Sequence, residues 1–127
     1  MFDRDDLFRK LDLQLYDVGL LVQSGLRLAA YGRRGKAALN LSRRTGYSQR
    51  RLYDLAKLVT VFTGREYKRW LDTIPAGHLI LIATLSSPRD RQELLRRLPG
   101  RPLCYRLLLA EVGRRQRAYR RRKGRAE

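Results

Sequence analysis

Apolar residues in this chain recur at helical spacing, and they almost nowhere alternate with polar residues as they would in a half-buried strand. Glycine and proline divide the chain into segments of helical length. The sequence therefore predicts an all-α fold, a bundle of about six or seven helices. In the N-terminal segment the apolar stripe runs down one helix face through Leu7, Leu11, Leu15, Val18 and Val22.

The breaks between segments predict where the helices lie. Gly19 and Gly25 are expected to bend or split the first helix, and residues 32–35 are expected to form a loop. Ser87 and Pro88 read as the cap and first residue of a helix. The further helices are expected at about residues 36–44, 49–62, 65–71, 78–85, 88–98 and from 102 onward. The last is expected to bury Leu103, Leu107, Leu108 and Val112, and the single Cys104 is expected in the core.

The charge of the chain is unusual. It holds 29 Lys and Arg against 12 Asp and Glu, a formal net charge of +17. Such an excess repels itself in a compact fold and is typical of a protein with a polyanionic partner. Arginine predominates, and its planar fork matches phosphate or guanine, which favours nucleic acid over an anionic membrane. Residues 27–57 hold nine basic residues and only one acidic residue, Asp54.

A helix-turn-helix is predicted within that basic region. Gly46 can adopt the positive φ that a tight turn requires, and Ser48 can cap the helix that follows. Leu41 is expected to point inward from the first helix, with Ser42 as the small neighbour at the turn. Leu52 and Leu55, one turn apart, are expected to anchor the second helix.

If the second helix enters a major groove, its N-terminal residues meet base edges. Gln49 then suits adenine and Arg50 suits guanine, while Asp54 could accept from cytosine or brace an arginine. The residues expected to contact bases are Ser48, Gln49, Arg50, Tyr53, Asp54 and Lys57. The residues expected to contact phosphates are Arg33, Arg34, Lys36, Arg43, Arg44, Arg51, Arg114, Arg115, Arg117, Arg120, Arg121, Arg122 and Lys123.

The stretch AALNLSRRTGYSQRRLYDLAKLVTVF (37–62) resembles the helix-turn-helix core of ParB/KorB-type partition proteins. The stretch TIPAGHLILIATLSSPRDRQELLRRL (73–98) is similar to the segment that follows it in that family, including a glycine–histidine step at His78. The resemblance spans about residues 32–112 and implies a DNA-binding module. The arginine-rich nucleotide-binding domain of the family has no counterpart in this sequence, so no nucleotide switch is implied.

No pattern predicts catalysis, and we expect no enzyme activity and no cofactor. One His and one Cys cannot build a Cys/His zinc site, and residues 32–36 are too short for a Walker loop. One cysteine, an acidic N-terminal stretch and no long apolar run favour a cytoplasmic location, with the nucleoid or a plasmid as the site of action, and no membrane partner.

Three regions are predicted: an N-terminal helical region (1–31), a helix-turn-helix domain (32–112) and a basic tail (113–127) that is either helical or disordered. The expected function is duplex DNA binding by a homodimer, as a regulator or accessory of partition or replication on a plasmid, phage or mobile element. The stripe of Leu7, Leu11, Leu15 and Val18 in the first region is either a dimer interface or a cover for the core of the bundle. Two alternatives stay open: a nonspecific architectural or RNA-binding protein, and a module that docks on another protein such as a polymerase or replisome.

Overall fold

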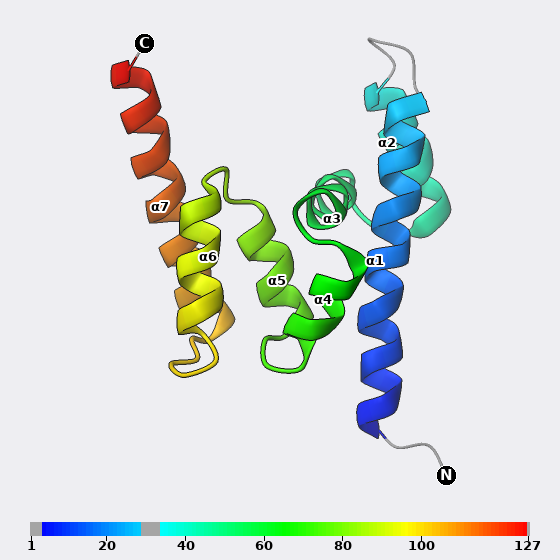
Figure 1. The fold of residues 1–127 in the computed structure, drawn as a ribbon. Coiled ribbons are helices and arrows are strands. Elements are labelled where there is room, and N and C mark those ends of the chain that lie inside the picture. The colour runs from blue at the N-terminus through cyan, green and yellow to red at the C-terminus, as the bar shows by residue number, and fades with distance from the viewer. Residues whose placement is uncertain (1–3, 29–33, 127) are drawn as a thin grey trace. The chain divides into compact units, whose positions relative to one another are not determined.

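The computed structural model describes residues 4–28 and 34–126, with side chains described for 6–27 and 35–124. Within them it has seven helices and no strand, which confirms the predicted all-α class (Figure 1). The chain divides into two compact units, residues 1–68 (unit 1) and residues 69–127 (unit 2). The boundary falls within the fourth helix.

Unit 1 is built on three helices, α1 (Arg4–Leu28), α2 (Arg34–Thr45) and α3 (Gln49–Val61). Each of the three contacts the other two. Their shared core is formed by apolar side chains at helical spacing, each about 1% exposed or less: Val22, Ala38, Leu52, Leu55 and Leu58. The apolar periodicity of this part of the sequence therefore becomes a three-helix core.

The first helix is uninterrupted, so the prediction that Gly19 and Gly25 bend or split it was wrong. Both glycines instead lie where α1 meets a neighbouring helix. A Cβ built at Gly19 would lie 2.6 Å from the carbonyl oxygen of Leu55 in α3, and one at Gly25 would lie 3.3 Å from Leu41 in α2. The glycines let the helices approach closely, and this packing offsets their low helix propensity. The expectation of a loop over residues 32–35 was wrong at its end, because Arg34 and Gly35 lie within α2. Residues 32 and 33 lie outside the described residues.

The fourth helix, α4 (Gly64–Leu71), begins with a reciprocal cap. The Thr63 hydroxyl accepts from the backbone N–H of Glu66 at 3.2 Å, and the Glu66 carboxylate accepts from the N–H of Thr63 at 3.1 Å. Tyr67 is buried, its ring stacks on Tyr16 of α1 with centroids 5.3 Å apart, and its hydroxyl donates to the carbonyl of Asp12 at 2.7 Å. The first turn of α4 is thereby fixed to α1.

Unit 2 contains α5 (Ala76–Ala83), α6 (Pro88–Arg97) and α7 (Tyr105–Ala126). Helix α5 contacts both α6 and α7, and most of its residues are buried. This burial explains why its sequence is apolar on every side of the helix. As predicted, Ser87 caps α6 by accepting from the backbone N–H of Asp90 at 3.3 Å, and Pro88 is the first helical residue. His78 donates from Nε2 to the carbonyl of Leu103 at 2.8 Å, which gives it a structural role.

Three expectations for residues 102–112 were wrong. The last helix begins at Tyr105 rather than at Pro102, and Cys104 is exposed in the segment before it. Leu107 is 50% exposed, whereas Leu108 and Val112 are buried. Leu108 and Val112 are four residues apart and share a face, but Leu107 lies about 100° from Leu108 around the helix and so points away from the core.

Candidate nucleic-acid interface

The turn between α2 and α3 has the geometry that the sequence predicted. Gly46 adopts a φ of 79°, and its N–H donates to the carbonyl of Ser42 at 2.9 Å. The Ser42 hydroxyl donates to the carbonyl of Tyr47 at 2.6 Å, so this small residue holds the turn from inside. Ser48 caps α3 by accepting from the N–H of Arg51 at 3.1 Å. A glycine, two serines and their hydrogen bonds thus set where α3 starts.

The inner face of α3 anchors it in unit 1. Leu52, Leu55 and Leu58 are 1% exposed or less, and they follow one another every three residues along the helix. The close approach of Gly19 brings α1 against the backbone of α3 at Leu55. At the far end of the helix, the Gln23 amide donates to the Thr60 hydroxyl at 2.8 Å. Because one side of α3 is fixed so closely, its opposite side is presented outward in a defined orientation.

The outer face of α3 consists of Gln49, Arg50, Tyr53 and Lys57, all of which are exposed. Tyr53 keeps 40% of its surface exposed although its ring is large and apolar. Ser48 is exposed at the N-terminal end of the same helix, and Asp54 is half-buried at the edge of the face. The structure therefore brings the predicted base-contacting residues together on one helix, with Asp54 the least accessible.

The predicted phosphate contacts of unit 1 differ in accessibility. Lys36, Arg43 and Arg44 are exposed on α2. Arg51 is half-buried. Burial and the charge of Asp12 raise the pKa of Tyr67, and the charge of Arg51 partly offsets this rise. Position 51 lies about 40° from Leu55 around the helix, at about 100° per residue, so Arg51 is on the inner side of α3 rather than on its outer face. Arg33 lies outside the described residues, and of Arg34 only the backbone is described.

The predicted basic tail is part of a helix. α7 continues without a break from Tyr105 to Ala126, so the helical alternative for residues 113–126 is the one observed. Lys123 lies over the ring of Tyr119, with Nζ 5.4 Å from the ring centroid. The predicted phosphate contacts that are exposed on this helix are Arg114, Arg117, Arg120, Arg121, Arg122 and Lys123.

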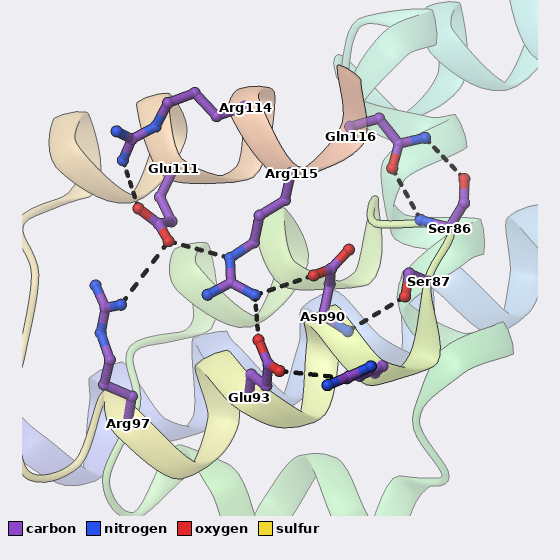
Figure 2. A network of polar contacts seen from close by, with 10 residues as sticks. Ser86, Ser87, Asp90, Glu93, Arg97, Glu111, Arg114, Arg115 and Gln116 are labelled. Carbon is purple, nitrogen blue, oxygen red and sulfur yellow. Dashed lines mark hydrogen bonds and ion pairs between the residues drawn. The ribbon is translucent and has the colours of Figure 1, made fainter. Parts of the chain in front are cut away.

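Arg115 differs from its neighbours because its charge is matched within unit 2 (Figure 2). Its guanidinium donates to Asp90 at 3.0 Å, to Glu93 at 2.7 Å and to Glu111 at 3.0 Å. Only 19% of its side chain is exposed. These contacts tie α7 to α6, and beside them the Gln116 amide and Ser86 exchange two hydrogen bonds of 2.7 and 3.0 Å. A guanidinium held by three carboxylates has a structural role, unlike the exposed arginines on the same helix.

The network also changes the acidity of its members. The hydrogen bond from Arg115 is the main reason that the pKa of Glu93 is lowered. Burial by itself would raise the pKa of Glu111, but the hydrogen bond from Arg115 and the charges of Arg115, Arg114 and Arg97 outweigh it and lower that pKa. One oxygen of Asp90 is buried without a hydrogen-bond partner among the described residues.

Two further arginines of unit 2, Arg97 and Arg106, were not among the phosphate contacts predicted from the sequence. Both line a hollow with Arg114 and Arg117 on the solvent side of α7. Arg97 also lies 3.8 Å from the Glu111 carboxylate. The position of Arg106 could have been predicted from the sequence, because positions 106, 114 and 117 fall on one side of a helix. Arg97 comes from another helix, so its position depends on tertiary packing.

Within residues 4–28 and 34–126, no three His, Cys, Asp or Glu side chains are grouped so that they could hold a metal ion. Nor does that part of the chain contain a helix with both the length and the apolar character needed to cross a lipid bilayer. Comparison of the sequence and the structure with protein families, curated proteins and solved structures found no match.

Proposed function

We propose that this protein binds duplex DNA site-specifically, with α3 as the recognition helix of a helix-turn-helix. The observation that carries the proposal is the two-sided character of α3. Its inner leucines are buried, while Gln49, Arg50, Tyr53 and Lys57 are exposed together on the other side. Glutamine and arginine are side chains that can make paired hydrogen bonds to adenine and guanine in a major groove.

The surroundings of α3 support the same proposal. Lys36, Arg43 and Arg44 are exposed on α2, the helix that crosses the phosphate backbone in this motif. The exposed Ser48 and the first N–H groups of α3 are suited to a phosphate oxygen at the helix N-terminus. The net charge of +17 supplies the long-range attraction that brings a protein to a polyanion.

A second copy of the chain is part of the proposal. One recognition helix contacts only a few base pairs, so strong specificity requires two helices on two half-sites. α1 exposes Leu7 and Leu11, at 46% and 48%, with Leu15 and Val18 half-buried along the same stripe. This stripe is the surface we propose for pairing. A role as a regulator or partition accessory, akin to ParB/KorB-type proteins, belongs to the same proposal.

The test is selection from a random duplex DNA library at about physiological salt, where nonspecific phosphate binding is weakened. We expect a recovered motif with inverted-repeat symmetry. The variants Gln49→Ala and Arg50→Ala should each relax the motif at one position, with a loss of about 1–3 kcal/mol against the preferred base.

The matched control is Arg69→Ala, which removes one exposed arginine from α4 and should leave the motif unchanged. Retention of the library without any motif would contradict site-specific reading. It would favour the alternative in which the protein binds nucleic acid through its charge alone.

A further inference from the structure

The solvent side of α7 carries a row of arginines that the proposed function does not explain by itself. Positions 106, 114, 117 and 121 fall within an arc of about 80° on the helix, at about 100° per residue. From first to last they span about 22 Å at about 1.5 Å per residue. All four arginines are exposed. We call Arg106, Arg114, Arg117 and Arg121 the arginine track.

The side of α7 opposite the track is fixed as far as Gln116, which holds the first part of the track in place. Leu108 and Val112 are buried in unit 2, and Arg115 and Gln116 are bonded to α6 and to the segment before it. The track therefore cannot turn toward the interior of unit 2. The track belongs to a helix whose first half is held by packing and hydrogen bonds, unlike arginines on an unstructured tail.

The first part of the track lies in a hollow of about 670 Å³, where Arg97 joins it. Figure 2 shows Arg97 and Arg114 on opposite sides of Glu111, the one acidic residue that lines the hollow. Four guanidinium groups therefore share a site with one carboxylate. The small residues Ala110 and Gly113 also line the hollow, and a Cβ built at Gly113 would lie 3.3 Å from the Arg117 guanidinium.

We propose that the arginine track and its hollow bind the phosphodiester backbone of nucleic acid, independently of base sequence. The inference builds on the proposed function and adds a second contact region, in unit 2, to the recognition helix of unit 1. The excess of cations over the single carboxylate creates a positive potential that favours an anionic ligand. The linear arrangement, continuing beyond the hollow to Arg121, fits a strand of regularly spaced phosphates better than one isolated anion. Arginine is suited to this role because its fork pairs with two phosphate oxygens.

The test compares two double variants of the full chain that lose the same charge. Arg97→Gln with Arg106→Gln removes two guanidinium groups from the hollow. Arg96→Gln with Arg101→Gln removes two exposed arginines that do not line it. Affinity for a labelled duplex of arbitrary sequence is measured by fluorescence anisotropy over a range of salt concentrations.

We expect the variant with Arg97→Gln and Arg106→Gln, the hollow variant, to lose affinity on the order of tenfold. The slope of log affinity against log salt should become less steep by up to about 2, because each lost phosphate contact accounts for about 0.9. The control should change both much less. Because Arg97 is near Glu111, the thermal midpoint of each variant is recorded. A comparison of the single variants Arg106→Gln and Arg101→Gln repeats the test with the Arg97–Glu111 ion pair intact. Arg106 itself has no ion pair among the described residues.

Equal losses in the two double variants would overturn the inference, because the track would then act only as general charge. Competition gives a second criterion: displacement of the duplex by poly-glutamate as effectively as by inorganic polyphosphate would indicate an acidic protein partner instead. Library selection separates this inference from the proposed function. The hollow variant should recover the same motif as the wild type, whereas failure of the wild type to recover any motif would refute site-specific reading and leave the track intact.

Discussion

Gly19 of α1 lies so close to Leu55 of α3 that a methyl group at position 19 would come within 2.6 Å of the Leu55 carbonyl oxygen and 2.7 Å of Val59. Real Cβ atoms do not approach backbone oxygens so closely, and the oxygen belongs to a helix that cannot yield locally. Gly19→Ala should therefore push α1 away from α3 and lower the free energy of unfolding by about 1–3 kcal/mol. Chemical denaturation followed by circular dichroism measures this loss.

The control for that substitution is Gly35→Ala in α2, where an added Cβ would meet nothing within 4 Å. Because alanine favours a helix over glycine, this change should leave stability unchanged or raise it by up to about 1 kcal/mol. A Gly19→Ala protein as stable as the Gly35→Ala protein would show that the α1–α3 crossing is looser than described.

The turn at Gly46 yields a second prediction. Its φ of 79° lies in the left-handed region, which an alanine side chain adopts only with strain. Gly46→Ala should lower the free energy of unfolding by about 1–2 kcal/mol, and Gly46→Asn by less, because asparagine tolerates this region better. Thermal unfolding of the two variants tests the order. Since no atom lies within 4 Å of the added Cβ, a cost that is equal for both would point to something other than the backbone angle.

The turn and α3 could be predicted from sequence because their determinants are local. Gly46, Ser48, Leu52 and Leu55 lie within ten consecutive residues, and their roles follow from a positive φ, a cap and a one-turn spacing. The helix boundaries at Ser87 and Pro88 were predictable for the same reason. The seven-helix architecture follows from many such local signals.

The errors have a common cause, which is that the answer depended on residues distant in sequence. Gly19 reads as a helix breaker until Leu55 is known to lie against it. Arg115 reads as one more arginine in a basic run, but its partners Asp90 and Glu93 are 25 and 22 positions away. The exposure of Cys104 and Leu107 depended on where α7 begins and which of its faces packs on α5, neither of which the apolar spacing fixed.

The carboxylates around Arg115 lead to a third prediction. Arg115→Met keeps much of the packing volume but leaves Asp90, Glu93 and Glu111 without their shared cation. Because Asp90 and Glu111 are largely buried, at 14% and 17% exposed, the free energy of unfolding should fall by about 2–4 kcal/mol. Hydrogen exchange should show the loss in α6 and α7.

Arg114→Met is the matched control, since it removes the same charge from the adjacent position. Arg114 also pairs with Glu111, but 67% of its side chain is exposed, and an exposed pair contributes about 0–1 kcal/mol. If both variants lost the same stability, general charge rather than the network would account for the effect.

The lowered pKa values of Glu93 and Glu111 predict how stability depends on pH. A carboxyl group with a lower pKa in the folded chain contributes stability that is complete above its ordinary value of 4.5 and is lost as the pH falls through the lowered folded value. Glu93→Gln with Glu111→Gln should therefore be less stable than the wild type at pH 7 and less sensitive to acid below about pH 4.5. Urea unfolding at a series of pH values measures both effects.

Asp12 should act in the opposite sense and serves as the comparison within unit 1. Burial raises the pKa of its carboxyl group, so the folded chain holds that proton more strongly than the unfolded chain does. Its contribution to stability is present below its ordinary value of 3.8 and is lost as the pH rises through the raised value. Asp12→Asn should thus gain stability relative to the wild type as the pH increases from 3 to 7. A gain that decreases over this range would show that Asp12 is stabilised as the anion by a partner.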